Sequence, residues 1–595
     1  MTDTNVDGKV QRIQAMLYAK ASNEPDIRFK RLYKYLTRIE WVEAAIDRIL
    51  RNRGSRTPGI DSKTRGHYQE AKARAQLIAS IVEELQTQTY QPQPVRRVYV
   101  KKANGKQRPL GIPTIKDRVV QQMVRMALEP IYEATFLPCS YGFRPNRCTW
   151  DALAEAYFYL LPCCQYYTVI EGDIQDCFGS IHHGTLMRQL RRRIVDERVQ
   201  ALIWKMLRAG VLEDLQYAET SVGAPQGGIA SPILSNVYLH RLDEWFYDRF
   251  HVLTGHERAK MRRQGKLAAV RYIRYADDFI VLMRRADRAQ VLKAELAEFV
   301  AQELKMTLSD EKTTIVHASQ GFDFLGVCTF VGPKRSNPDK LLPFQVPSQK
   351  SVKAYRAKVK ELTHPNLDYL PPGERVRTLN WLIVGWANYH RWGNAKKTFS
   401  ALKDWTIRKV HTMLRRYTPE GKRTTYRKYF RPVSECDNLR RWKRYSNWLT
   451  PSVEVNGEMR VGLLPMSVIS TAAYWKFRGC KIPPAYRLLN DNTQWLERKT
   501  EFYTDVEAIE NAEVGQASRW YTGKYSLVYF YNRKVVFRRD NYTCAVCGYH
   551  SQRQKGEVND LEIHHLDPEG GYDTGNLATV CLSCHQRLTT IQQAD

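Results

Sequence analysis

Residues 270–282 read Val270-Arg-Tyr-Ile-Arg-Tyr-Ala-Asp-Asp-Phe-Ile-Val-Leu282, two β-prone apolar runs on either side of an acidic pair. This pattern predicts a β-hairpin with Asp277 and Asp278 at its turn. Most Asp-Asp pairs lie in solvated turns, but carboxylates with apolar flanks need a partner or a metal. About a hundred residues earlier, Thr168-Val-Ile-Glu-Gly-Asp173 predicts another strand that ends in a carboxylate. Two-metal phosphoryl transfer requires carboxylates on rigid strand ends.

The segments around this hairpin mix strands and helices without regular alternation, which predicts an α+β domain. Val95–Lys101 alternates like a strand and Asn104-Gly105 follows it, so a β-hairpin is expected over about 95–112. Helical periodicity and short apolar runs predict further elements. They are helices over 28–50, 68–86, 115–135 and 287–305, and strands near 313–317 and 322–330.

Composition places the chain among folded, strongly basic proteins. It has 595 residues, 92 Lys and Arg against 62 Asp and Glu, a formal net charge of +30 and 43% hydrophobic residues. That hydrophobic content is too high for a disordered polycation, and the length predicts several domains. The sequence contains no apolar run of about 18 residues and no apolar signal segment near Met1. We therefore expect a cytoplasmic protein, neither secreted nor bound to a membrane, whose partner is a polyanion such as nucleic acid.

Proline marks a change of character at about 333–347, and residues 350–480 are predicted to be helical and very basic. Residues 391–444 carry 17 Lys and Arg against 4 Asp and Glu. Nine aromatic residues are interleaved with or border these charges: Tyr389, Trp392, Trp405, Tyr417, Tyr426, Tyr429, Phe430, Trp442 and Tyr445. We expect about half of them to pack in a core. Stacking faces mixed with cations are typical of nucleic-acid contact.

The twelve cysteines divide into two groups. Eight are scattered in apolar surroundings and are predicted to be reduced, buried thiols: Cys139, Cys148, Cys163, Cys164, Cys177, Cys328, Cys436 and Cys480. Four form two C-x-x-C pairs near the end of the chain: Cys544, Cys547, Cys581 and Cys584. Two such pairs can supply four thiolates to one tetrahedral Zn²⁺. A segment of about sixty residues has little core, so this structural metal would provide much of its stability.

Several further motifs stand in a fixed order along the chain. They are Lys102…Arg108-Pro-Leu-Gly-Ile-Pro113, Ser140-Tyr-Gly-Phe-Arg-Pro145, Asp173-Ile-Gln-Asp-Cys-Phe178, Ala224-Pro-Gln-Gly-Gly-Ile-Ala-Ser-Pro232, Tyr275-Ala-Asp-Asp278, Leu308-Ser-Asp-Glu-Lys312 and Gly321-Phe-Asp-Phe-Leu-Gly326. In this order they resemble the successive fingers and palm blocks of reverse transcriptases over about residues 50–330.

Three more features resemble the group II intron-encoded proteins, the maturase–reverse transcriptases. Gly54-Ser-Arg-Thr-Pro-Gly-Ile-Asp61 is similar to their N-terminal block. Leu382-Ile-Val-Gly-Trp-Ala-Asn-Tyr-His390 and Arg427-Lys-Tyr-Phe430 are similar to their thumb, or maturase, domain. The C-terminal tail resembles their endonuclease domain.

The resemblance implies roles for the polymerase residues. Asp173, Asp277 and Asp278 match the carboxylates that bind two Mg²⁺, with the Ile174 backbone carbonyl as an extra ligand. The nucleotide-binding residues would be Lys102 and Arg108 on the triphosphate, Phe178 beside the ribose 2′ position and Gln226 beneath the nucleotide. The family commonly has Asp after the motif phenylalanine, where this chain has Gly179. We expect that departure to alter local packing rather than the chemistry.

The tail also contains Ile563-His-His-Leu-Asp-Pro568, Gly575-Asn-Leu577 and Cys584-His585, which resemble the HNH, or ββα-metal, endonuclease motif. By that resemblance His565 is the general base and Asn576 orients it, while His564 and His585 hold a divalent metal, expected to be Mg²⁺. The assignment of His564 and His565 could be the reverse.

The predicted organisation is a multidomain chain that begins with an α+β right-hand polymerase. Residues 1–345 form fingers and palm, 346–480 an α-helical thumb or maturase (X) domain, 481–535 a DNA-binding segment assigned on position alone, and 536–595 a zinc-stapled HNH domain. The resemblance implies a bacterial reverse transcriptase, maturase and endonuclease that acts in intron mobility. Its partners would be group II intron RNA, target DNA and dNTPs.

Three alternatives remain at this point. One is an RNA-binding splicing maturase without an active polymerase, which the intact Asp173, Asp277 and Asp278 argue against. Another is a reverse transcriptase of the retron or phage-defence kind, which the HNH tail and the maturase-like segment disfavour. The third is an HNH nuclease that uses the rest of the chain only as a guide, and the number of polymerase motifs disfavours it.

Overall fold

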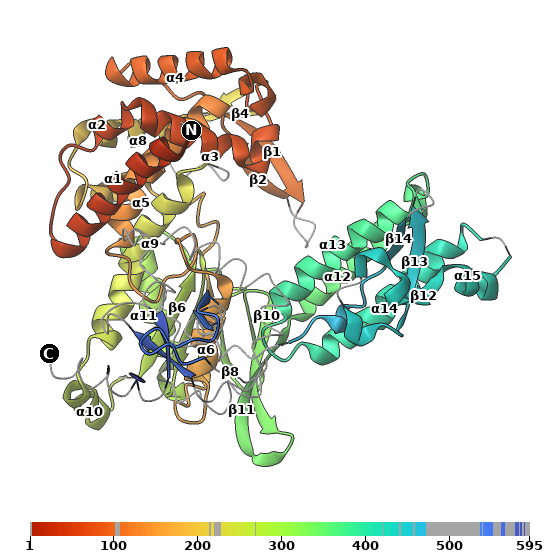
Figure 1. Ribbon diagram of the computed structural model, residues 1–595. Helices are drawn as coiled ribbons and strands as arrows, with labels where there is room; N and C mark the ends of the chain where they lie inside the picture. The colour runs from red at the N-terminus through yellow and green to blue at the C-terminus, as the bar shows by residue number, and fades with distance from the viewer. Residues whose placement is uncertain are drawn as a thin grey trace. The chain divides into compact units, whose positions relative to one another are not determined.

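The protein is described by a computed structural model whose elements are drawn in Figure 1. The described residues are 3–101, 107–213, 216–218, 228–267, 269–418, 420–439, 442–455, 459–471, 536–537, 539–550, 561–565, 577–581, 584–585 and 588. Most of them fall into two compact units. The first contains the described residues up to 325 and residues 329–343, and the second contains 326–328 and the described residues from 344 onward.

The first unit contains a four-stranded antiparallel sheet, here called the central sheet, in the order β6-β7-β3-β8. Its strands are β3 (Thr168–Asp173), β6 (Val270–Tyr275), β7 (Asp278–Met283) and β8 (Thr314–His317). The predicted hairpin over 270–282 and the predicted strand 168–173 are confirmed. Strand β7 is buried from Phe279 to Met283 because its apolar, β-branched run is covered on both faces.

Helix α5 (Ile115–Glu133) is buried along most of its length and packs against the N-terminal helices α1 and α3. It begins at Thr114, whose hydroxyl accepts a hydrogen bond from the backbone N–H of Asp117. The N-terminal helices are α1 (Asp3–Asn23), α2 (Tyr33–Leu36), α3 (Ile39–Arg51) and α4 (Ala71–Gln86). The helices predicted over 68–86 and 115–135 are confirmed.

The helix predicted over 28–50 is wrong in its first half. Phe29 forms a parallel β-bridge with Ile194, so the chain is extended at that point. The backbone of Arg38 is also extended, with ψ of 135°, and it separates α2 from α3. Apolar spacing alone did not reveal that the first of these residues pair with a strand-like segment more than 160 positions away.

A second four-stranded sheet has the order β2-β1-β4-β5. Its strands are β1 (Val95–Lys101), β2 (Gln107–Ile112), β4 (Val211–Glu213) and β5 (Gln216–Ala218). The predicted hairpin over 95–112 is confirmed by the antiparallel register from Arg96 opposite Ile112 to Lys101 opposite Gln107.

The remaining helices of the first unit are α6 (Thr149–Tyr159), α7 (His183–Arg191), α8 (Glu197–Leu207), α9 (Ser231–Phe246), α10 (Gly255–Arg263) and α11 (Ala289–Glu303). Helices α6 and α9 contact β6, and α11 contacts β3. A three-stranded sheet, in the order β11-β10-β9, follows. Its strands are β9 (Phe322–Phe324), β10 (Val327–Lys334) and β11 (Asn337–Pro347).

The second unit begins with four helices and continues with a sheet. The helices are α12 (Gln349–Leu362), α13 (Pro372–His390), α14 (Lys396–Arg415) and α15 (Lys422–Tyr429). The strands are β12 (Phe430–Pro432), β13 (Leu449–Val455) and β14 (Met459–Gly462), in an antiparallel sheet. The expectation that 350–480 is helical is therefore wrong over 430–462. Val453 and Val461 lie opposite each other in this sheet and pack on the same core as the helices.

The described C-terminal residues contain β15 (Leu561–His565) and β16 (Leu577–Cys581), which pair antiparallel from Leu561 opposite Cys581 to His565 opposite Leu577. A small apolar cluster that includes Val536, Phe537, Ile563 and Val580 supports this pair. Of the helices in the described part of the chain, none has the length and apolar character needed to cross a membrane.

The expected burial of the scattered cysteines is confirmed only in part. Cys139, Cys177 and Cys436 are buried, but Cys163 is exposed. Three others, Cys148, Cys164 and Cys328, are half-buried, and Cys480 lies outside the described residues. Apolar neighbours in sequence do not fix burial, because the covering atoms come from other elements.

Candidate active sites

Strand register brings the predicted polymerase carboxylates together at one end of the central sheet. Asp173, the last residue of β3, lies directly opposite Asp278, the first residue of β7. Asp278 also lies opposite Tyr275 of β6, so Ala276 and Asp277 form the turn between these strands. The backbone of Ala276 is left-handed, with φ of 59°. Asp173 and the Asp277-Asp278 pair, about a hundred residues apart in sequence, thus meet at one end of the sheet, which is the arrangement that divalent cations need.

A lysine that had no assigned role contacts this group of carboxylates. Lys312 Nζ lies 2.6 Å from a carboxylate oxygen of Asp173. The backbone N–H of Ser309 donates to the Asp173 carbonyl at 2.8 Å, which fixes the turn that carries Lys312. The hydrogen bond that Lys312 donates to Asp173, together with the charges of Asp278 and Asp277, raises the pKa of Lys312. The site therefore attracts cations.

The other predicted polymerase residues are only partly described. Ile174 is 2% exposed and forms an antiparallel bridge with Leu308. Phe178 is buried and meets Phe143 edge-on, with ring centroids 6.3 Å apart. The backbone of Arg108 lies in β2 opposite Val100. Lys102 and Gln226 lie outside the described residues.

The departure at Gly179 has a packing reason. A Cβ atom there would lie 2.0 Å from a carboxylate oxygen of Asp176, so any larger residue would have to displace that side chain. Asp176 itself has a left-handed backbone, with φ of 42°. Gly179 therefore leaves room for the Asp176 side chain in the segment that follows β3.

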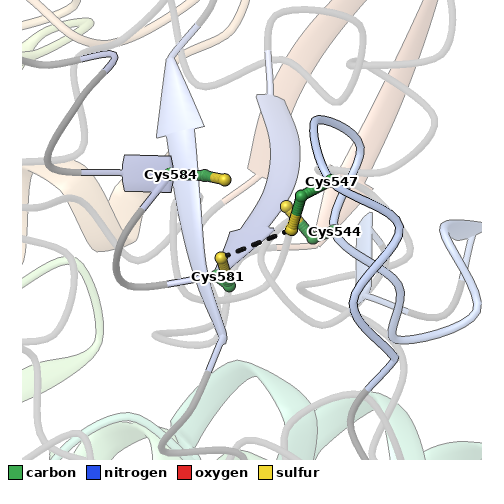
Figure 2. Close-up of side chains that lie close together, drawn as sticks. All are labelled: Cys544, Cys547, Cys581 and Cys584. Carbon is green, nitrogen blue, oxygen red and sulfur yellow. Dashed lines mark hydrogen bonds between the residues drawn. The ribbon is translucent and has the colours of Figure 1, made fainter.

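The four paired cysteines converge on one point, as Figure 2 shows. Their sulfur atoms all lie within 4.8 Å of one another, and Cys547 Sγ lies 3.7 Å from Cys581 Sγ. Tetrahedral thiolates about 2.3 Å from a zinc ion are separated by about 3.8 Å. The donor set and its spacing therefore fit zinc.

Two local structures position these thiols. Cys544 and Cys547 lie in a tight turn in which the Cys544 N–H donates to the carbonyl of Tyr549 and the Gly548 N–H donates to the carbonyl of Cys544. Gly548 has φ of 73°, which favours glycine. Cys581 ends β16. The pKa of Cys584 is raised to about 12, chiefly by its hydrogen bond to Cys581.

Two of the predicted nuclease residues lie side by side. The rings of His564 and His585 meet edge-on with centroids 5.3 Å apart, and His564 is 4% exposed. His585 Nδ1 lies 3.2 Å from a carboxylate oxygen of Glu562, a partner that sequence reasoning missed. The backbone of His565 lies in β15 opposite Leu577, and Asn576 lies outside the described residues. The roles of these residues remain predictions.

Comparison with known families matches three parts of the chain. Residues 100–329 match the reverse transcriptase (RNA-dependent DNA polymerase) family, 352–430 the group II intron maturase-specific domain and 544–590 the HNH endonuclease family.

Curated proteins also match. Protein YkfC of Escherichia coli (strain K12) is 38% identical over 338 residues, which are 53% of this chain and 87% of that protein. The group II intron-encoded protein LtrA of Lactococcus lactis subsp. cremoris is 37% identical over 344 residues, 50% of this chain and 56% of LtrA. The putative COX1/OXI3 intron 2 protein of Saccharomyces cerevisiae is 26% identical over 351 residues, 52% of this chain and 40% of that protein. The chain thus spans about half the length of these last two relatives.

A reverse transcriptase fold with a C-terminal HNH endonuclease domain defines an RNA-directed DNA polymerase that also carries a nuclease. The maturase-specific domain between the two narrows this class. The chain belongs to the family of group II intron-encoded proteins, reverse transcriptase–maturases with an HNH domain. The family expected from the sequence is confirmed.

Proposed function

We propose that the protein binds its own group II intron RNA, promotes splicing and nicks target DNA. It then copies the intron RNA into DNA, with the 3′-hydroxyl of the nicked strand as primer. The observation that carries the polymerase part is the register of Asp173 and Asp278 at one end of the central sheet, with Asp277 beside them. These three carboxylates would hold two Mg²⁺. Mg²⁺ held there would lower the pKa of the attacking 3′-hydroxyl and neutralise charge on the leaving pyrophosphate.

The chain's own residues supply the rest of this proposal. Asp173 and Asp278 are fixed by backbone pairing rather than by flexible loops, so the carboxylates do not need to reorganise when substrate binds. Phe178, which is buried and meets Phe143 edge-on, is proposed to limit the space beside the ribose 2′ position. Lys102, Arg108 and Gln226 are proposed to bind the incoming nucleotide.

The nuclease proposal rests on the paired rings of His564 and His585 beside the four thiols. These two histidines would hold a divalent metal that stabilises charge at the scissile phosphate, and Mg²⁺ is proposed. His565 is proposed to accept a proton from the attacking water, oriented by Asn576. Zn²⁺ on Cys544, Cys547, Cys581 and Cys584 would hold the strands that carry these groups.

RNA binding by the second unit is supported by the surface of α15. Lys422, Arg423, Arg427 and Lys428 are all exposed there, while Thr425 and Tyr429 anchor the helix to the core. Tyr426 is 45% exposed and stacks on Phe430 with ring centroids 4.2 Å apart. We call the four cations and Tyr426 the α15 surface. Four cations beside an exposed ring suit a phosphate backbone and an unpaired base.

The polymerase part is tested by changing Asp277→Ala and Asp278→Ala together. The wild-type protein should extend a DNA primer on an RNA template in Mg²⁺, and the double variant should not. Its support of intron splicing should largely remain, because RNA binding is spread over other surfaces. Equal loss of both activities would show that the site is a structural platform for RNA. A group II ribozyme flanking the open reading frame would support the intron assignment.

The RNA-binding part is tested by changing the four cations of the α15 surface to glutamine. Binding of intron RNA should weaken, and the magnitude of the slope of log affinity against log salt should fall by about 3, because each lost phosphate contact removes about 0.7–0.9 of slope.

A matched control removes four cations that already pair with carboxylates: Lys9, Arg285, Lys358 and Arg377. The change in net charge is the same, but the salt slope should hardly move. Equal slopes for both variants would contradict a local electrostatic surface on α15.

A further inference from the structure

Arg274 is the second residue before the turn that carries Asp277, and it is wholly buried. Its side chain and that of Asp243, on α9, are both 0% exposed. Arg274 Nε and Nη2 donate to the two carboxylate oxygens of Asp243 at 2.7 and 2.5 Å. Burial by itself would raise the pKa of Asp243, but attraction by Arg274 outweighs it and holds that pKa below its ordinary value. The pair is therefore ionised.

The remaining donors of Arg274 reach the catalytic turn and two other segments. Nη1 donates to the backbone carbonyl of Ala276 at 2.9 Å and to the side-chain oxygen of Asn236 at 3.0 Å. Nη2 also donates to the hydroxyl of Ser140 at 2.8 Å. The Ala276 carbonyl belongs to the peptide that joins Ala276 to Asp277. The guanidinium thus holds the peptide that leads into the acidic pair.

The segment around Ser140 packs against the backbone of the turn. The Arg274 N–H donates to the carbonyl of Cys139, and the Tyr141 N–H donates to the carbonyl of Arg274, each at 2.9 Å. A Cβ atom on Gly142 would lie 2.2 Å from the backbone nitrogen of Ala276. Asn236 fixes this close approach, since its amide donates to the Gly142 carbonyl at 2.8 Å.

Stability alone is a weak reason for such a pair. Desolvating two charges offsets most of their attraction, and well-packed apolar residues often replace a buried ion pair without loss of stability. An apolar pair, however, offers no donor to the Ala276 carbonyl. Only a planar group with several fixed donors can bond Asp243, Ser140, Asn236 and Ala276 at once.

We propose that Arg274 is a positioning residue for the polymerase site, an inference that rests on the polymerase function proposed above. Through the Ala276 carbonyl it fixes the left-handed turn, and through Ser140 it holds the Gly142 backbone against that turn. Asp277 and Asp278 are thereby set relative to Asp173. The Arg274 side chain is wholly buried, and it acts through the backbone of the turn.

The test compares Arg274→Met, which leaves Asp243 buried without its partner, with Arg274→Met combined with Asp243→Leu. We would measure the melting temperature, the Mg²⁺ concentration for half-maximal primer extension, and Mn²⁺ binding by electron paramagnetic resonance. The single variant should lose stability and activity. The double variant should regain most of the melting temperature while its primer extension stays at least about 10-fold low and both metal affinities stay at least about 5-fold weak. Recovery of activity and metal affinity together with stability would overturn the proposal.

Arg274→Lys covers the case in which the double variant does not fold. Lysine keeps the charge beside Asp243 but cannot reach all four partners. It should fold and show the same weakened metal affinity, and a folded Arg274→Lys protein with ordinary metal affinity would overturn the proposal. Arg375→Met, at a buried arginine of the second unit, is the control for general destabilisation and should leave metal affinity unchanged. If the wild type bound Mn²⁺ but extended no primer, the polymerase proposal would fail. The Mn²⁺ affinities of the wild type and the variants would still decide whether Arg274 positions the acidic turn.

Discussion

The central sheet and the C-terminal strand pair each present functional groups at strand ends, but they are stabilised in different ways. The central sheet has four strands, with Val169, Val281 and Leu282 wholly buried in it. The C-terminal pair has two strands, and its described apolar cluster is small. Two strands alone are marginal in water. The four converging thiols, through the zinc proposed to bind them, would stabilise this pair in the way that packed side chains stabilise the central sheet.

In the central sheet the proposed catalytic residues are not the residues that stabilise the fold. In the C-terminal strand pair the stabilising thiols and the proposed nuclease residues belong to the same small module. In the central sheet the carboxylates lie on a frame that packing already holds, so they can be changed without unfolding it. In the C-terminal pair Cys581 is both a strand residue and a proposed zinc ligand. Removal of a thiol there is expected to remove structure as well.

The largest effect is expected from Cys547→Ala. It opens the tetrahedral site, and because structural zinc provides about 10–16 kcal/mol of apparent binding free energy, zinc should be lost and the module should melt with its nicking activity. Primer extension should be unchanged, since the central sheet has its own core. Bound zinc, strand nicking and primer extension would be measured side by side. Cys163→Ala, at an exposed cysteine of the first unit, is the control. Zinc and nicking retained in Cys547→Ala would contradict the structural site.

The next largest effect is expected from His565→Ala, which removes the proposed base but no thiolate. Nicking should fall by about 10²–10⁴-fold, the usual contribution of general base catalysis, while zinc content, cDNA synthesis and splicing stay intact. His550→Ala, at a histidine that bonds Thr543, is the control and should nick normally. Normal nicking by His565→Ala would transfer the role of base to His564.

The third prediction concerns the pH dependence of stability at His390, a buried histidine of the second unit. His390 is 3% exposed, and Ser351 bonds its Nε2 at 2.8 Å. Burial lowers the pKa of His390 to about 4. The unfolded chain therefore binds the extra proton first as pH falls, so stability is full above about pH 6.5 and is lost as pH approaches 4.

The loss should be about 3 kcal/mol between those limits. Denaturation at several pH values, followed by the fluorescence of Trp386 that packs on His390, would measure it. His390→Gln should flatten the pH dependence by that amount. An unchanged pH profile in this variant would show that His390 is not responsible.

The smallest effect concerns two glycines. A Cβ on Gly172 of β3 would lie 2.1 Å from the ring of Phe279, whereas a Cβ on Gly385 of α13 meets nothing within 4 Å. Gly172→Ala should therefore cost about 1–3 kcal/mol of unfolding free energy by overpacking. Gly385→Ala should stabilise by up to about 1 kcal/mol, because alanine is the better helix former. Chemical denaturation of both variants measures this, and equal effects would contradict close packing at the central sheet.

Local pattern predicted much of this fold. The hairpins over 95–112 and 270–282 and the helix over 115–135 follow from strand alternation, turn residues and helical periodicity, which are properties of neighbours in sequence. The same reasoning failed over 430–462, where the strands carry few charges and pack against the helical core. It also failed at Phe29, whose partner is Ile194.

The sequence by itself determined which groups carry the proposed chemistry: the order of the polymerase motifs, the two C-x-x-C pairs and the His-His dipeptide are written in local spacing. The tertiary structure alone decided what supports them. Lys312 meets Asp173 across 139 positions, Arg274 meets Ser140 across 134, and Glu562 meets His585 from another element. The spacing of residues in the sequence indicates only contacts within the same helix, strand or turn. Partners that are distant in sequence are chosen by how the buried surfaces pack, and that choice appears only when the chain is folded.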